Sequence, residues 1–196
     1  FSKKIFLAKT SIKNLPEKYK SKICQVGSIL DKNIINYSNF KKNNNKKNFF
    51  SILVLGGSQG AEIFGKIIPP VIKMLKNKGY EIEINQQCIK KQKVSIVDFY
   101  KKNNIKNYVF EFDKNILKLI LSSDLAITRC GASTTAELTH TLTPFIAVPL
   151  PHSIDNHQYL NAKYYEDKGY CWLLEQDNFS SKNLFNLLVE TIENKN

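Results

Sequence analysis

The sequence has 196 residues, 42% of them hydrophobic, so it can bury a core as one large domain or as a domain with part of another. The net charge of +12 comes from lysine, with Arg129 as the sole arginine, which argues against a protein that recognises bases through planar arginine contacts. The four cysteines are far apart, so they indicate neither a zinc site nor a disulfide framework, and a reducing cytoplasm fits them. No apolar run reaches the roughly 18 residues that a membrane span requires.

The first 48 residues contain a strand-like segment, Lys22 to Val26, and a polar tract at 41–47. The tract has no apolar residue to bury, so we predict a linker or a surface loop. The chain begins at Phe1 on a segment that resembles the interior of a protein, and we expect a fragment.

From Phe49 onward, strand-like and helix-like segments alternate. Strands are predicted at Phe49–Leu55, Glu81–Gln86, Tyr108–Glu111, Leu125–Thr128, Phe145–Val148 and Tyr170–Leu174, and helices at Ala61–Lys78 (broken at Pro69-Pro70), Lys91–Asn103, Asn115–Ser122, Thr134–Thr141, Asn156–Lys168 and Ser180–Asn194. For the last helix, Ser180 or Ser181 is the expected cap. This order predicts an α/β fold, a Rossmann-like parallel sheet with helices on both faces.

The segment from Phe49 to Ala61 is an apolar run that ends at Gly56 and Gly57 and leads into a helix. A continuous run of this kind is typical of a strand buried on both faces. The glycines allow a sharp turn, and the free amides of the next helix favour an anion. We therefore predict that the turn holds a diphosphate.

Two nucleotide-binding motifs do not fit this segment. The dinucleotide fingerprint G-x-G-x-x-G fails because Ser58 occupies the place of the second glycine, and the next strand ends in Asn85 and Gln86 without an acid for a ribose. Gly60–Lys66 resembles a P-loop, but Ile67 replaces the hydroxyl that binds magnesium.

A third motif gives an alternative function. Gly56–Gly60 matches the G-x-S-x-G nucleophile elbow, with Ser58 as the nucleophile and Asp124 or Asp155 followed by His157 in hydrolase order. A serine hydrolase is thus the alternative prediction.

Two further loops follow predicted strands. Arg129–Thr134 again places a glycine and small residues before a helix, which predicts a second group of anion-binding amides. Glu137 either caps the Thr134 amide, in a T-x-x-E capping box, or accepts two ribose hydroxyls. Because ligands bind beyond the carboxyl ends of parallel strands, we expect these loops and Pro149–Gln158 to converge on one cleft.

The loop Pro149–Gln158 is stiffened by two prolines. Asp155 is a candidate cap of the following helix. His157 and Gln158, in the first turn of that helix, are candidates for hydrogen bonds to sugar hydroxyls.

Other residues are assigned no chemistry. We expect His140 on the surface and Tyr170 and Trp172 in the core. The sequence has no D-x-D pair, so we predict no metal site, and no cofactor is expected.

Three motifs together, LGGSQGA, RCGASTTAEL and PLPHSIDNHQYLNA, resemble the donor-binding half of the MurG family of bacterial N-acetylglucosaminyltransferases, in glycosyltransferase family 28. The resemblance covers about Cys24 to Gln176. It implies the C-terminal half of a two-domain GT-B enzyme that moves N-acetylglucosamine, with inversion, from UDP-N-acetylglucosamine to undecaprenyl-diphosphoryl-N-acetylmuramyl-pentapeptide. It also implies a cytoplasmic protein, peripheral on the inner face of the cell membrane. The lysine-rich composition favours an anionic membrane surface as a partner, and no nucleic acid is expected.

The resemblance further implies a role for each matching position. Gly57, Ser58 and Gln59 would contact the diphosphate and sugar, and the backbone at Phe112 and Asp113 would contact uracil. Ala132, Ser133 and Thr134 would offer amides to the phosphates, Glu137 would bind the ribose, and His157 and Gln158 would hold the N-acetylglucosamine. The catalytic base would lie in the N-terminal domain.

The domain boundaries follow from the same resemblance. Residues 1–27 would end the N-terminal acceptor domain, 28–48 would form the junction and polar linker, and 49–196 would form the UDP-sugar-binding domain without its last helix. We expect such a chain to bind donor weakly and to catalyse nothing by itself.

Two segments depart from the family pattern. The usual G-N-P-V-R at the junction is Gly27 to Asp31 here, with Asp31 in place of the arginine. The usual H-Q-[ST]-G is Asn85-Gln86-Gln87-Cys88. A third possible function is a non-catalytic nucleotide-sugar-binding subunit that works with a separate membrane chain.

Overall fold

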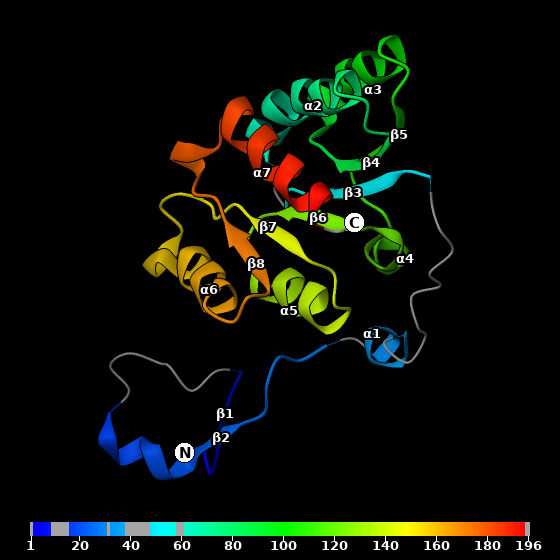
Figure 1. The fold of residues 1–196 in the computed structure, drawn as a ribbon. Coiled ribbons are helices and arrows are strands. Elements are labelled where there is room, and N and C mark those ends of the chain that lie inside the picture. The colour runs from blue at the N-terminus through cyan, green and yellow to red at the C-terminus, as the bar shows by residue number, and fades with distance from the viewer. Residues whose placement is uncertain (1, 9–15, 31, 38–47, 58–60, 195–196) are drawn as a thin grey trace.

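The computed structural model describes residues 2–8, 16–30, 32–37, 48–57 and 61–194 (Figure 1). Its centre is a six-stranded sheet in which every neighbouring pair is parallel. In spatial order the strands are β5 (Lys106–Phe110), β4 (Ile82–Gln87), β3 (Phe50–Leu55), β6 (Leu125–Thr128), β7 (Phe145–Ala147) and β8 (Cys171–Leu173). The predicted α/β class and parallel sheet are confirmed.

Helices cover both faces of this sheet (Figure 1). One face carries α2 (Glu62–Asn77), α3 (Lys93–Lys102) and α7 (Ser181–Glu193), and the other carries α4 (Ile116–Ser122), α5 (Ala132–His140) and α6 (His157–Glu166). Side chains alternate between the faces along a strand. Thus Ile52 and Val54 of β3 belong to the first core, whereas Leu53 and Leu55 belong to the second. A continuous apolar run is needed because both faces are covered.

The predicted break in the helix α2 is wrong. The helix continues through Pro69 and Pro70 instead of breaking there. Each proline removes a backbone donor, but the buried face of this helix packs on the sheet and on α7. Tertiary packing stabilises the helix more than the two missing hydrogen bonds weaken it.

The last helix, α7, follows the sequence pattern closely. Ser180 is its N-cap, since the Oγ atom of Ser180 accepts a hydrogen bond from the Asn183 amide at 3.2 Å. Its apolar stripe, Leu184, Leu188 and Ile192, is buried against α2.

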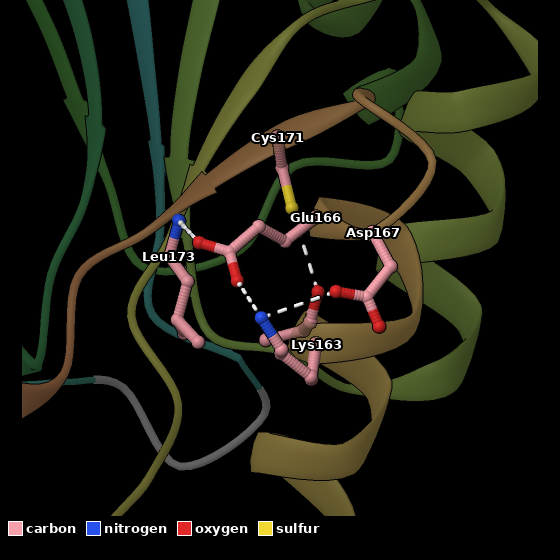
Figure 2. A network of polar contacts seen from close by, with 6 residues as sticks. Lys163, Glu166, Asp167, Cys171 and Leu173 are labelled. Atoms are coloured by element: carbon pink, nitrogen blue, oxygen red, sulfur yellow. Dashed lines mark hydrogen bonds and ion pairs between the residues drawn. The ribbon is translucent and has the colours of Figure 1, made fainter.

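The predicted core position of two aromatic residues at the edge strand β8 is wrong. Tyr170 and Trp172 are 44% and 37% exposed, so neither is a core residue. Among the described residues β8 is the outermost strand on this side, and at the end of α6 the Glu166 carboxylate accepts a hydrogen bond from the Leu173 amide at 3.3 Å and pairs with Lys163 at 2.8 Å (Figure 2). A carboxylate at this position occupies an edge amide that another strand would otherwise use.

The N-terminal segments lie apart from the six-stranded sheet (Figure 1). β1 (Ile5–Leu7) pairs in parallel with β2 (Ile23–Gln25), which lies within the predicted strand at Lys22–Val26. A short 3-10 segment, η1 (Glu17–Lys22), precedes β2. The predicted junction contains a short helix that was not expected, α1 (Lys32–Tyr37), next to α5, whereas the polar tract 41–47 is outside the described residues.

Candidate functional site

The strand order reverses between β3 and β6, because β4 and β5 follow on one side and β7 and β8 on the other. In open parallel sheets this switch point, at the carboxyl ends of the strands, is where ligands bind. The tip of β3 is Gly56-Gly57 and the tip of β6 is Arg129 to Gly131. Gly57 has φ of +77°, and a Cβ added there would lie 3.9 Å from the Cβ of Arg129. The first two predicted loops are therefore neighbours.

The glycine turn is held by a side chain to which the sequence analysis assigned no role. Gln87, at the end of β4, accepts a hydrogen bond from the Gly56 amide at 3.0 Å through its Oε1 atom. Its Nε2 atom donates to the carbonyl of Glu111 at 3.1 Å. One amide group thus connects the tip of β3 to the segment that follows β5.

The second loop leads into α5, whose N-cap is Gly131. Ala132, Ser133 and Thr134 form the first turn, where helix geometry leaves the amides without an intrahelical acceptor. This arrangement suits the predicted anion contacts. Since no side chain caps the helix and Thr134 lies inside it, the capping-box alternative for Glu137 is wrong. Glu137 instead accepts a hydrogen bond from Ser133 Oγ at 2.7 Å.

Gln158 joins the second and third loops. Its Oε1 atom accepts hydrogen bonds from the amides of Cys130 at 3.1 Å and Leu150 at 2.9 Å. The predicted sugar contact can therefore come only from the Nε2 end of this side chain, because the oxygen already has two donors. Gln158 is a structural bridge as well as a candidate ligand contact.

The third loop has an unusual backbone. His152, Asp155 and Asn156 have φ of 54°, 50° and 55°, in the left-handed region that non-glycine residues seldom adopt. Asn156, and not Asp155, is the N-cap of α6, and no side-chain cap bond forms, so the predicted capping role of Asp155 is wrong. His157 is exposed and pairs through Nδ1 with the Ile154 carbonyl at 2.8 Å.

The segment after β5 presents Phe112 to solvent, with 77% of its surface exposed. Asp113 beside it accepts hydrogen bonds from Tyr108 Oη at 2.9 Å and from the Asn115 amide at 2.6 Å. The Asp113 carboxylate thus already has two donors, and the predicted uracil contact is one with the backbone of this segment.

A family model decides the broader class of the chain. The model for the glycosyltransferase family 28 C-terminal domain matches residues 51–196. The chain belongs to this family. The match begins at the second residue of β3 and includes all the other strands of the six-stranded sheet.

Individual relatives agree with the family model. A transferase of Rickettsia felis named UDP-N-acetylglucosamine--N-acetylmuramyl-(pentapeptide) pyrophosphoryl-undecaprenol N-acetylglucosamine transferase is 42% identical over 202 residues, covering 99% of this chain and 56% of its own. The Pelagibacter ubique protein of the same name is 39% identical, with 100% and 54% covered. The chain thus spans about half the length of the relatives it matches.

A solved structure shows the same architecture. The crystal structure of MurG from Acinetobacter baumannii superposes with a TM-score of 0.73 at 25% sequence identity, over 87% of this chain and 51% of that one. The Rossmann-like fold predicted from the sequence is therefore confirmed for this family 28 domain.

Arg129, in the RCGAST segment of this family 28 domain, is 8% exposed. Its Nη1 atom donates to the carbonyls of Val148 at 3.1 Å and Pro149 at 3.0 Å, and its guanidinium lies over the Phe64 ring, 5.0 Å from the centroid. Burial lowers the pKa of Arg129. Arg129 therefore ties the tip of β6 to the start of the third loop.

Two buried thiols, Cys130 and Cys171, belong to the core on the face of α4, α5 and α6. Burial raises the pKa of Cys130, and burial, with a smaller effect of Glu166, raises the pKa of Cys171 to about 12. Both groups are therefore neutral thiols at neutral pH, without the thiolate that reactive cysteines need.

The serine hydrolase alternative loses one of its candidate acids. Asp124 accepts a hydrogen bond from the Ser51 amide at 2.8 Å, and its own amide donates to the Ser51 carbonyl at 2.8 Å. These bonds lie at the amino ends of β6 and β3, about 17 Å along β3 from the start of the glycine turn at Gly56. Ser58 and Gln59 lie outside the described residues. Family membership leaves the hydrolase without support.

The described part of the chain offers neither a metal site nor a membrane-spanning helix. The described residues contain no group of three His, Cys, Asp or Glu side chains placed to hold a metal ion. Within the same ranges, no helix has both the length and the apolar character that a membrane crossing requires.

Proposed function

We propose that this chain is the donor-binding part of a transferase that moves N-acetylglucosamine from UDP-N-acetylglucosamine to undecaprenyl-diphosphoryl-N-acetylmuramyl-pentapeptide. The observation that carries the proposal is the 42% identity, over 99% of the chain, to a protein named for this reaction. The position of the glycine turn and of the α5 N-terminus at the switch point of the sheet supports a nucleotide-sugar ligand.

The diphosphate would lie between Gly57 and the first turn of α5. The amides of Ala132, Ser133 and Thr134 point out of the helix end, and the helix dipole adds positive potential there. During transfer, negative charge grows on the departing UDP as the glycosidic bond breaks. Donors that are fixed in place before the reaction stabilise this charge without reorganising.

The nucleoside and the sugar would be held on either side of the diphosphate. Glu137 would accept the ribose hydroxyls, with Ser133 holding one carboxylate oxygen in place. Uracil would lie against the backbone of Phe112 and Asp113. Gln158 would donate from Nε2 to a hydroxyl of the N-acetylglucosamine, with His157 beside it in the first turn of α6.

The acceptor hydroxyl on carbon 4 of the muramyl sugar would attack the anomeric carbon and displace UDP with inversion. The catalytic base would come from the N-terminal half, which the relatives contain in addition to the matched region. The protein would act in the cytoplasm at the inner face of the membrane, where its lysine-rich composition favours an anionic surface. We expect the present chain to bind UDP-N-acetylglucosamine weakly and to transfer no sugar by itself.

Calorimetric titration with UDP tests the proposal. Glu137→Ala should weaken binding about tenfold or more, because hydrogen bonds to a charged group are worth about 1.5–3 kcal/mol. UDP that lacks its ribose hydroxyls should bind both forms equally. Glu190→Ala, an exposed glutamate on α7, is the matched control and should bind like the parent chain. A folded sample with no affinity for UDP would refute the proposal.

A separate test must show whether donor binding and catalysis reside in one polypeptide or in two. Sequencing the upstream coding region distinguishes a single-chain enzyme, with a contiguous N-terminal domain, from a nucleotide-sugar-binding subunit that works with a separate membrane chain. We propose the single-chain enzyme, because the relatives that match this chain over 99–100% of its length carry the additional half in one polypeptide.

A further inference from the structure

Gln87 touches two parts of the proposed site at once. The register of β4 and β5 pairs Gln87 with Phe110, and the pairing continues with a hydrogen bond of 2.9 Å from the Cys88 amide to the Phe110 carbonyl. Beyond this point the two strands separate. The side chain of Gln87 then spans to Glu111 on one side and to Gly56 on the other.

The two bonds use opposite ends of a single planar group. Oε1 accepts from the Gly56 amide and Nε2 donates to the Glu111 carbonyl, so the spacing between these backbone positions is set by the amide itself. Glu111 is also anchored through its own carboxylate, 3.5 Å from Lys93 Nζ. The Gly56 amide is occupied by Gln87, so amide contacts of the turn with a phosphate would begin at Gly57.

We propose that Gln87 is a positioning residue for the nucleoside diphosphate, which fixes the distance between the diphosphate turn and the uracil-binding segment after β5. The inference rests on the proposed function and adds a residue that makes no contact with the ligand. The two half-sites are the glycine turn and the segment after β5, and each alone should bind weakly. With Gln87 holding them at a fixed distance, a ligand that reaches both should bind more tightly, because its second contact becomes intramolecular once the first has formed.

The effect of Gln87 should therefore depend on the ligand. UDP spans both half-sites. Uridine reaches the segment after β5 and Glu137 but not the glycine turn, and inorganic diphosphate reaches the glycine turn and the first turn of α5 but not the segment after β5. A residue that merely stabilises the fold would affect all three ligands in parallel. A residue that sets the spacing would affect UDP far more than the other two.

Titration of the 196-residue chain with UDP, uridine and inorganic diphosphate, followed by NMR, measures this difference. Gln87→Met keeps the length of the side chain and loses both hydrogen bonds. It should weaken UDP binding about five- to tenfold, on the scale of one or two lost hydrogen bonds, and change the other two affinities less than twofold. Gln87→Glu keeps the acceptor for Gly56 but not the donor to Glu111. Its added negative charge beside the turn should weaken inorganic diphosphate as well as UDP, so Gln87→Met is the variant that isolates the spacing.

The matched control is Asn107→Leu. Asn107 donates from its side-chain amide to the Ile105 carbonyl at 2.9 Å, near the opposite end of β5, so its loss should leave all three affinities unchanged. Parent-like UDP binding by Gln87→Met would overturn the inference, and so would a parallel loss of all three ligands. A parent chain without affinity for UDP would instead refute the donor site itself, and the role of Gln87 with it.

Discussion

Arg129 and Gln176, 47 residues apart in the sequence, are joined by a hydrogen bond of 2.6 Å from the guanidinium Nη2 atom to the side-chain Oε1 atom. Gln176 follows β8, and Arg129 follows β6, two strands away in the sheet. With its two bonds to backbone carbonyls after β7, Arg129 connects the tips of three consecutive strands. The only arginine of the chain therefore organises one half of the carboxyl edge of the sheet.

Arg129→Lys should destabilise the protein although it keeps the charge. A lysine ammonium is a single point and cannot reach the carbonyls and Gln176 from separate nitrogens, nor stack as a planar group on Phe64. We expect a loss of about 2–3 kcal/mol in the free energy of unfolding, measured by urea titration. Lys118→Arg, on an exposed position of α4, should leave the unfolding midpoint unchanged. Equal stability of Arg129→Lys and the parent chain would contradict this role.

Gln158→Glu should distinguish the two roles of this side chain, the link between the second and third loops and the contact with N-acetylglucosamine. A glutamate keeps an oxygen that accepts from the Cys130 and Leu150 amides, but it loses the Nε2 donor proposed for the N-acetylglucosamine. We expect the variant to bind UDP like the parent chain and to lose the additional affinity for UDP-N-acetylglucosamine. Gln158→Ala removes both functions and should also lower the free energy of unfolding by about 1–3 kcal/mol. Calorimetry with both ligands checks the pair of variants, and full retention of sugar affinity by the glutamate would exclude the contact.

Stability should fall at alkaline pH because of Cys171. Burial raises the pKa of this thiol to about 12 in the folded protein, above the value of about 8.5 expected in the unfolded chain. Between these values the unfolded state has lost the proton that the folded state keeps, so the free energy of unfolding decreases by up to about 1.4 kcal/mol per pH unit for this group. The stabilisation is complete below the unfolded pKa and is lost as the pH rises towards 12.

Urea titrations between pH 8 and 10.5 measure that decrease. Cys171→Ala removes the titrating group, so its stability should fall less steeply with pH than that of the parent chain, whatever its absolute value. Identical slopes for the two proteins would show that the thiol does not contribute.

Asp124→Ala should weaken the fold without affecting the ligand. The carboxylate holds the Ser51 amide at the amino edge of the sheet, opposite to the candidate site. We expect a loss of about 1–3 kcal/mol in the free energy of unfolding, with a smaller loss for Asp124→Asn, which keeps an acceptor oxygen. Affinity for UDP should be that of the parent chain in both variants. Labelling of the parent chain by a fluorophosphonate that these substitutions abolish would instead revive the hydrolase.

Much of the fold was predictable because a strand or helix that is buried by its neighbours carries a regular pattern of apolar residues in its own sequence. The run from Phe50 to Leu55 is apolar except for Ser51 because helices cover both sides of β3, and the spacing of Leu184, Leu188 and Ile192 shows which face of α7 is buried. The continuous α2 and the exposure of Trp172 were missed. Both depend on neighbours that are distant in the sequence, namely α7 packed against α2 and the absence of a further strand beyond β8 among the described residues.

The sequence by itself determined the class of the protein: glycines and small residues after apolar strands set the three loops, and their motifs identified the family. Only the tertiary structure decided which side chains hold those loops together. Gln87, Gln158 and Arg129 bond to backbone groups that lie far away in the chain, and Asp124 proved to belong to the opposite edge of the sheet. The physical reason is that a hydrogen bond between a side chain and the backbone has no sequence period, since any residue has an amide or a carbonyl to offer and only the folded geometry selects the partner.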